Sequence, residues 1–204
     1  MKRLPWFTFA FAVLAVTVFR IPSLTDALQF DRNAFAQGQW WRLTTAHLTH
    51  FTGDHLRWDL LAFIVLGSMS ERLSRPGLLM TIGIASVVIT AGVWLAQPQF
   101  TTYRGLSGID SALFGFVIAD LFATGRRERH GFSIVVAVVA LAGFSAKSLF
   151  ELVTGGTVFV EGSAAFAPVP LAHLLGLAVG IIIALKHESR RHPISAAVLS
   201  SAHG

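Results

Sequence analysis

Ser107 stands in a glycine-containing stretch, Gly105-Leu106-Ser107-Gly108, at the beginning of a long apolar run. Serine is favoured at the start of a helix, so a capping role is one interpretation. The other is a nucleophile, provided that a nearby base takes the proton of the hydroxyl group. His173, at the start of another apolar stretch, has a ring that titrates near neutral pH and suits that task. Together the two residues would perform acyl transfer; a His173 that packs against a backbone carbonyl is the alternative.

Three histidines and an aspartate lie close together earlier in the chain: His47, His50, His55 and Asp59. Imidazole and carboxylate groups bind zinc and similar ions, so a metal site is one hypothesis. The second hypothesis is a lining for acyl transfer, in which His55 donates a hydrogen bond to the oxyanion. The backbone N–H of Ser107 would be another donor, since a helix N-terminus favours negative charge. His47 by itself is interpreted as a hydrated loop residue.

Other ionisable residues also fall in apolar stretches. Asp110 follows Ser107 by three residues, so a place in a catalytic triad is conceivable. We favour a structural role, because an acidic side chain in the first turn interacts well with the helix dipole. Lys147 and Glu151 are four residues apart and are expected to pair with each other.

The composition indicates a membrane protein. Of the 204 residues, 53% are hydrophobic and 13% are charged, and the mean hydropathy is +0.63. A soluble domain carries about 25% charged residues. The basic pI of about 10.7 is therefore attributed to cytoplasmic loops and not to nucleic-acid binding. The chain has no cysteine, which excludes disulfides and thiolate chemistry.

Six stretches are long and apolar enough to span a bilayer, which predicts an all-α membrane protein with one domain over residues 1–192. They are residues 5–21, 55–71, 77–96, 107–124, 131–152 and 169–187. The first is expected to be a retained helix, because no signal-peptidase pattern follows it directly. Residues 193–204 are expected to be a short, disordered polar tail.

The basic residues predict the orientation of the spans. One set of span ends holds ten of the sixteen: Lys2, Arg3, Arg72, Arg75, Arg126, Arg127, Arg129, Lys186, Arg190 and Arg191. The opposite ends hold four: Arg20, Arg32, Arg42 and Arg104. Both termini are therefore expected in the cytoplasm. The second, fourth and sixth helices then run inward, which brings His55, Ser107 and His173 to the same depth near the outer face.

Small residues predict that the fourth and sixth helices approach closely, because small faces allow membrane helices to touch. The fourth helix offers Gly108, Ser111, Ala112 and Gly115, and the sixth offers Gly176 and Gly180.

Several motifs occur in an order typical of one family. They are Trp41-Arg42 in the first loop, His50, His55 and Asp59 in an H-x4-H-x3-N register, Glu71-Arg72 ending the second helix, Gly105-x-Ser107-Gly108 opening the fourth, and His173 with Gly176 and Gly180 on the sixth. Over residues 40 to 180 the chain thus resembles the rhomboid intramembrane serine proteases, whose basic form has six helices and both ends inside.

The resemblance implies a Ser107–His173 dyad that cleaves peptide bonds in or beside a transmembrane segment, with His55 and the Ser107 N–H holding the oxyanion. His50, Gly105 and Gly108 would be accessory, and no metal or cofactor would be needed. The fifth helix and the loop at 153–168 would gate the lateral approach of substrate. Asp59 departs from the family, which usually has asparagine there. An ionised carboxylate would repel an oxyanion, so Asp59 must be protonated, point away, or bind His55 or Arg57.

The stretch from Tyr103 to Gly108 and the lack of an added soluble domain also resemble rhombosortases, bacterial enzymes thought to trim C-terminal membrane anchors of exported proteins. The implied partners are a membrane-anchored protein substrate and the lipid bilayer, in a bacterial inner membrane with the active site towards the outer face. Two other functions stay open: a non-catalytic rhomboid-like protein that binds transmembrane clients, and a metal-binding or transport protein that uses the His47–Asp59 group.

Overall fold

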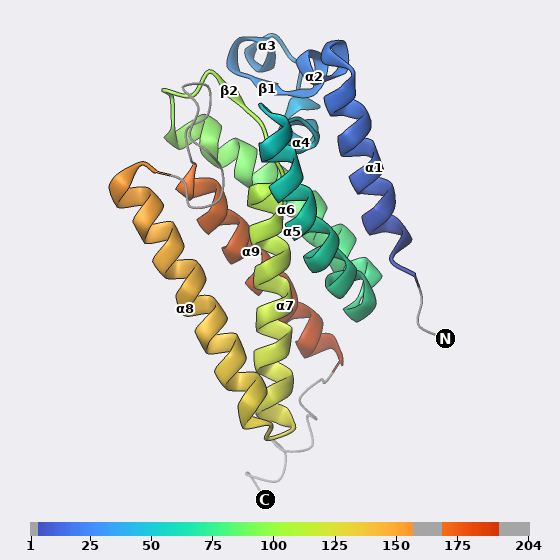
Figure 1. Cartoon of the computed structure of the whole chain (residues 1–204), viewed down its shortest axis with the longest axis vertical. Helices are drawn as coiled ribbons and strands as arrows, with labels where there is room; N and C mark the ends of the chain where they lie inside the picture. Colours follow the sequence, from blue (N-terminus) through green and yellow to red (C-terminus); the bar gives the residue numbers. More distant parts are fainter. Residues whose placement is uncertain (1–3, 157–168, 192–204) are drawn as a thin grey trace, which may run out of the picture.

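The computed structural model describes residues 4–156 and 169–191 as a bundle of long helices with a small cap at one end (Figure 1). The elements in chain order are α1 (Trp6–Arg20), α2 (Pro22–Leu28), β1 (Phe30–Asp31), α3 (Arg32–Ala36), α4 (Arg42–Thr45), the 3-10 helix η1 (Ala46–Leu48), α5 (Gly53–Leu73), α6 (Arg75–Ala96), β2 (Thr102–Tyr103), α7 (Ser107–Arg127), α8 (Gly131–Thr154) and α9 (Pro170–Arg191). The predicted tail at 193–204, and most of the predicted gating loop at 153–168, lie outside the described residues.

The long helices α1, α5, α6, α7, α8 and α9 occupy the six stretches expected from hydropathy. Among the described residues, α6, α7, α8 and α9 are each long and apolar enough to cross a membrane. A fifth span arises if α1 and α2, which are bent by 110°, are taken together. The chain is therefore an all-α integral membrane protein with four or five candidate spans.

The α5 helix is not apolar enough to count among these candidate spans, because it carries several charged side chains. Asp59 and Glu71 are nevertheless buried in the bundle. Glu71 accepts hydrogen bonds from the backbone N–H and the hydroxyl of Thr8, both 2.9 Å long. In addition α5 packs against α1, α6 and α7, so these two carboxylates face protein, whereas Arg57 is exposed.

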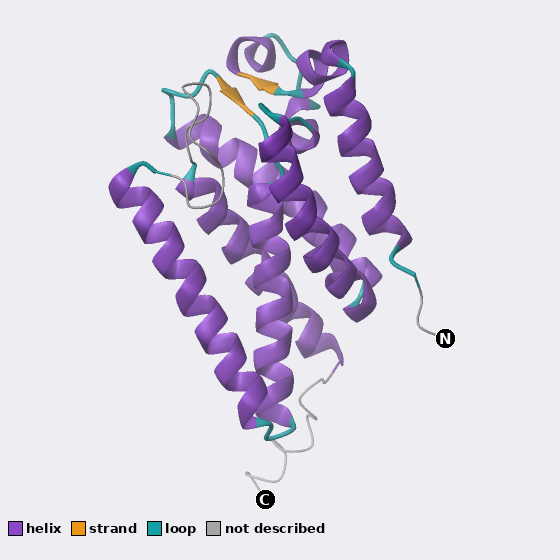
Figure 2. Cartoon of the chain, viewed as in Figure 1, coloured by secondary structure: helices purple, strands orange, loops and turns teal. Residues whose placement is uncertain are grey.

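The segment between α1 and α5, predicted only as a loop, folds into the cap of short helices seen at the top of Figure 2. Its strand β1 pairs antiparallel with β2, with Phe30 opposite Tyr103. Arg32 ties the cap to the end of α6, because its guanidinium donates to the carbonyls of Trp94, Gln97 and Phe100. The pairing matters for the site, since β2 leads directly into the residues before Ser107.

The helices α7 and α9 pack against each other more extensively than any other pair among the described residues. The carbonyl of Gly108 lies where a side chain on Gly176 would be, and the carbonyl of Ala112 occupies the same place for Gly180. A Cβ on Gly115 would come within 2.6 Å of the Leu177 carbonyl. The prediction that small residues bring these two helices together is confirmed.

In contrast, α8 lies at the edge of the bundle (Figure 1). Only Ala137, Ser148 and Glu151 of its 24 residues are buried. The remaining surface is largely apolar and exposed, as for Phe132 and Val153, which suits contact with lipid.

Candidate active site

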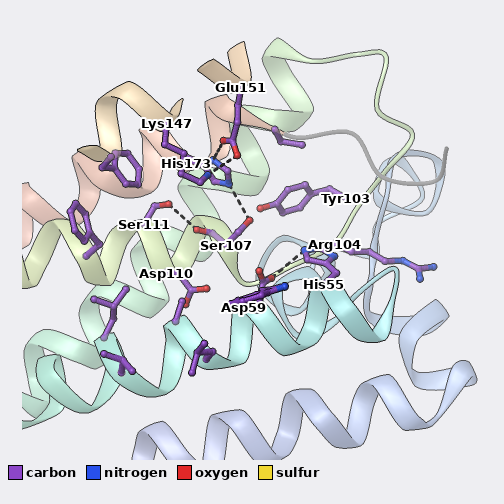
Figure 3. A pocket seen from close by; sticks show the side chains of 18 residues that line it. His55, Asp59, Tyr103, Arg104, Ser107, Asp110, Ser111, Lys147, Glu151 and His173 are labelled. Atoms are coloured by element: carbon purple, nitrogen blue, oxygen red, sulfur yellow. Dashed lines mark hydrogen bonds and ion pairs between the residues drawn. The ribbon is translucent and has the colours of Figure 1, made fainter. Parts of the chain in front are cut away.

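A cavity of about 490 Å³ lies between α5, α7 and α8, and the start of α9 closes one side (Figure 3). Its apolar lining comes mainly from α5, and α7 and α8 each add a phenylalanine, Phe114 and Phe144. The polar and ionisable lining residues are His55, Asp59, Tyr103, Arg104, Ser107, Asp110, Ser111, Lys147, Glu151 and His173. The arrangement is an apolar chamber with a cluster of reactive groups at one wall.

Ser107 and His173 meet in this cavity. The hydroxyl Oγ of Ser107 lies 3.2 Å from Nε2 of His173, a hydrogen-bonding distance (Figure 3). The capping interpretation of Ser107 is wrong, because the N-cap of α7 is Leu106 and no side chain caps this helix. Ser107 is instead the first residue of the helix, so its backbone is rigid while its hydroxyl points at the imidazole.

Asp59 binds its neighbours and does not point into open space. Its Oδ2 lies 3.2 Å from Nε2 of His50 and 3.2 Å from Nε2 of His55, and it accepts a 2.8 Å hydrogen bond from the backbone N–H of Leu106. Three nitrogen donors can therefore converge on a single carboxylate oxygen. Arg57, the other suggested partner, pairs with Asp54 instead.

Gly105 allows the chain before Ser107 to lie against this cluster. Its φ of +121° is in the region that residues with a side chain rarely adopt. A Cβ at this position would lie 2.8 Å from the His55 ring and 3.3 Å from the Asp59 carboxylate. Gly105 is thus required by both backbone conformation and close approach. Gly108 is constrained less strongly, since a Cβ there would meet side-chain atoms of Ile89 and Tyr103 at 3.0 to 3.3 Å and no backbone.

His47 is not the hydrated loop residue that the sequence suggested, because it is completely buried. Its Nδ1 lies 3.1 Å from the Gly105 carbonyl, and its Nε2 lies 3.1 Å from the hydroxyl of Thr90 and from the Ser86 carbonyl. Burial lowers the pKa of the His47 imidazole, so the neutral ring is favoured. A neutral imidazole carries one N–H, so it donates to the carbonyl of either Gly105 or Ser86, and the other ring nitrogen is an acceptor. His47 therefore supports the loop that carries Ser107.

The proposed metal group is not assembled as a binding site within residues 4–156 and 169–191. No set of three or more His, Asp or Glu side chains there is arranged to hold an ion. His47 is directed at backbone carbonyls, while His50 and His55 contact Asp59 directly. The metal hypothesis accordingly gains no support from the geometry.

The predicted pair of Lys147 and Glu151 is confirmed, with Nζ 2.7 Å from Oε1. The sequence interpretation missed a second contact: Oε2 of Glu151 lies 3.4 Å from Nδ1 of His173. The carboxylate that faces His173 thus belongs to Glu151 and not to Asp110. Asp110 is buried in the cavity wall, and its Oδ1 makes no hydrogen bond within the described chain. The position of Glu151 near the C-terminal end of an apolar helix, Gly131–Thr154, was the available signal.

Tyr103, which the sequence marked only as the start of the Tyr103–Gly108 stretch, also lines the cavity. Its ring is buried, and burial raises the pKa of its phenol well above the usual value. The hydroxyl therefore stays protonated and can donate a hydrogen bond to a molecule in the cavity.

The fold and the cavity define an all-α integral membrane protein with a serine–histidine pair inside the bundle. The chain belongs to the rhomboid family, since the family model described as Rhomboid domain matches residues 37–189.

Among curated proteins, the chain is similar to several bacterial rhomboid proteases. It is 32% identical to Rhomboid protease GlpG of Pectobacterium atrosepticum over 151 residues, which are 72% of this chain and 49% of that protein. It is 33% identical to Rhomboid protease GlpG of Photorhabdus laumondii over 71% of this chain and 46% of the relative. Rhomboid protease GluP of Bacillus subtilis is 28% identical over 69% of this chain and 30% of its own length. The matches thus cover half or less of these three relatives.

Proposed function

We propose that this protein is an intramembrane serine endopeptidase with Ser107 as nucleophile and His173 as general base. The observation that carries the proposal is the 3.2 Å contact between Ser107 Oγ and His173 Nε2 inside a cavity of the membrane bundle. Membership of the rhomboid family and similarity to proteins named rhomboid proteases support the same function.

In the proposed reaction, His173 Nε2 takes the proton of Ser107 as Oγ attacks the scissile carbonyl carbon. The carbonyl oxygen becomes an oxyanion. When the intermediate collapses, His173 gives this proton to the leaving amine and the C–N bond breaks, leaving an acyl-enzyme. Water then attacks the acyl carbon while His173 takes one of its protons; His173 returns that proton to Ser107 Oγ as the C–Oγ bond breaks and the carboxyl product leaves.

The backbone N–H of Ser107 is the first oxyanion donor in this proposal, because the first N–H groups of a helix have no intrahelical acceptor. His55 lines the cavity and is the second candidate, although its Nε2 faces Asp59 in the structure. Asp59 is assigned a supporting role: it orients His50 and His55 and holds the Leu106 peptide, so it does not itself contact the oxyanion.

The substrate in this proposal is a transmembrane or membrane-anchored protein that approaches between α5 and α8. These two helices line the cavity but barely pack against each other, so lipid-side access needs little rearrangement. The stretch at 153–168 remains the proposed gate.

The topology proposed for this site has six spans, with α5 included, because its buried carboxylates Asp59 and Glu71 face the neighbouring helices. Both termini are cytoplasmic in a bacterial inner membrane, and Ser107 lies towards the outer face. Within this function we further propose the rhombosortase role, the trimming of C-terminal anchors, on the resemblance of the Tyr103–Gly108 stretch.

A fluorophosphonate probe tests the function directly, since it labels only an activated serine. We expect labelling of the detergent-solubilised protein, none in Ser107→Ala, and almost none in His173→Ala. Ser70→Ala is a matched control, because Ser70 is buried on α5 and does not line the cavity. Equal labelling of wild type and Ser107→Ala would refute the assignment. An unlabelled wild type that retains intact membrane clients would favour the non-catalytic alternative.

A further inference from the structure

Glu151 links the catalytic pair to α8. Its two carboxylate oxygens serve different partners: Oε1 lies 2.7 Å from Lys147 Nζ, and Oε2 lies 3.4 Å from His173 Nδ1. On the other side of the same imidazole, Nε2 lies 3.2 Å from Ser107 Oγ. The three side chains come from α7, α9 and α8 and form one continuous row (Figure 3).

The contact between Glu151 and His173 is the only polar contact available to both atoms in the described chain. Neither Oε2 of Glu151 nor Nδ1 of His173 makes a standard hydrogen bond to any other group there, and both atoms are buried. Buried polar atoms are normally satisfied. A distance of 3.4 Å needs only a few tenths of an ångström to become a good hydrogen bond, and catalytic hydrogen bonds often tighten when substrate binds.

The tautomer of His173 follows from this neighbour. An ionised carboxylate only accepts hydrogen bonds, so Nδ1 must carry a proton to interact with it. The neutral ring then has an unprotonated Nε2, which is the form that can accept the Ser107 proton. Without the carboxylate, the proton can equally sit on Nε2, and that tautomer cannot act as a base towards Ser107.

Lys147 keeps this carboxylate in place. Glu151 is only 4% exposed, and a buried charge is costly unless it is paired. Lys147, one turn earlier on the same helix, supplies that pairing through Oε1 and leaves Oε2 directed at His173. The pair therefore explains how a carboxylate can be held beside the imidazole.

We propose that Glu151 is a positioning residue that holds His173 in its base-competent tautomer and orientation, so that the Ser107–His173 pair is complete only when the outer part of α8 lies against α9. This inference rests on the proposed function of the pair. Few residues of α8 are buried. The Glu151–His173 contact therefore couples the position of α8 against α9 to the orientation of the His173 ring. After proton transfer, the same carboxylate stabilises the imidazolium; the proton stays on His173 until the leaving amine takes it.

The test measures how fast a fluorophosphonate probe reacts, over a range of pH and probe concentration, in wild type, Glu151→Gln and Glu151→Asp. We expect Glu151→Gln to lower the maximal labelling rate about tenfold or more, with the half-saturating probe concentration nearly unchanged. The acid limb of its pH profile should move to lower pH, because the imidazolium loses a neighbouring negative charge. Glu151→Asp should react faster than Glu151→Gln, since it restores a carboxylate.

Other charged groups around His173 must be considered in the pH profile. Those that line the same cavity in the described chain are His55, Asp59, Arg104, Asp110 and Lys147. They are unchanged in the Glu151 variants, so a shift between those variants and wild type reports the Glu151 carboxylate.

Glu71→Gln is the matched control, because Glu71 is an equally buried carboxylate at the far end of α5. It should lower stability without moving the pH profile. A labelling rate in Glu151→Gln within twofold of wild type at every pH would overturn the inference and leave the serine protease assignment intact. Equal rate losses in Glu71→Gln and Glu151→Gln would also overturn it. If the wild-type protein itself is not labelled, both this inference and the serine protease assignment are contradicted.

Discussion

Gly180 of α9 lies directly against the backbone carbonyl of Ala112 on α7, with no room between them for a side chain. This contact lies one helical turn further along both helices than the contact between Gly176 and Gly108. Gly108 is the residue directly after Ser107. The backbones therefore touch along one face, and this fixes how far His173 stands from Ser107. The distance between Ser107 and His173 thus depends on glycines, which carry no side chain.

Gly180→Ala should separate α7 from α9, because the new methyl group would overlap backbone atoms that cannot move away. We expect the free energy of unfolding to fall by about 1–3 kcal/mol or more, which is typical of overpacking. Probe labelling should also fall strongly. Thermal unfolding in detergent measures the first effect. Gly83→Ala on α6 is the control, since nothing lies within 4 Å of its added Cβ. A Gly180→Ala protein as stable and as reactive as wild type would contradict the close contact.

Asp59→Ala should destabilise the protein by about 1–3 kcal/mol, because the buried N–H of Leu106 and the two histidines lose their common acceptor. Asp59→Asn should cost less, since the amide oxygen can still accept from Leu106. The midpoints of thermal unfolding of the three proteins test this order. If Asp59→Ala were as stable as wild type, the carboxylate would not be organising the cluster.

The folded protein should lose stability as the pH falls below about 6.5, the ordinary pKa of histidine. Burial lowers the folded-state pKa values of His47 and His50, so the unfolded chain binds more protons than the folded one in this range. The slope for each neutral, buried histidine is up to about 1.4 kcal/mol per pH unit.

Unfolding midpoints between pH 7.5 and pH 5.5 provide the measurement. Because His47 contributes to the slope, His47→Gln should show a shallower decline than wild type, although it starts from a lower stability. A decline with the same slope in both proteins would exclude His47 as a contributor.

Ser107→Ala and His173→Ala should each reduce peptide cleavage by about a thousandfold or more, and the double variant should be no worse than either one. Residues that act as a unit are not additive, because the base has no function without its nucleophile. Cleavage of a membrane-anchored test substrate by the three variants decides this. Additive losses would mean that the two side chains act in separate steps.

The proposed orientation can be tested with single cysteines, since the chain has none of its own. Gln99, between α6 and β2, and Glu128, between α7 and α8, are both exposed and lie at opposite ends of α7. A membrane-impermeant maleimide applied to intact cells should modify Gln99→Cys and spare Glu128→Cys. The opposite pattern would place Ser107 at the cytoplasmic face.

The sequence by itself determined the class of protein, the ranges of the long helices and the residues of the reactive pair. These features follow from local properties: apolar length sets a membrane helix, and small residues every four positions set the α7–α9 contact. The motif order also singled out Ser107 and His173 before any distance was known.

Only the tertiary structure decided what the other polar groups do. Whether Ser107 caps its helix, whether His47 is wet or buried, and which carboxylate faces His173 all depend on groups from distant parts of the chain. The contact of Glu151 with Lys147 could be predicted from the sequence, because the two residues are one turn apart on the same helix. The contact of Glu151 with His173 could not be predicted, because it depends on the packing of α8 beside α9. Spacing along the sequence carries no information on the distance between two helices.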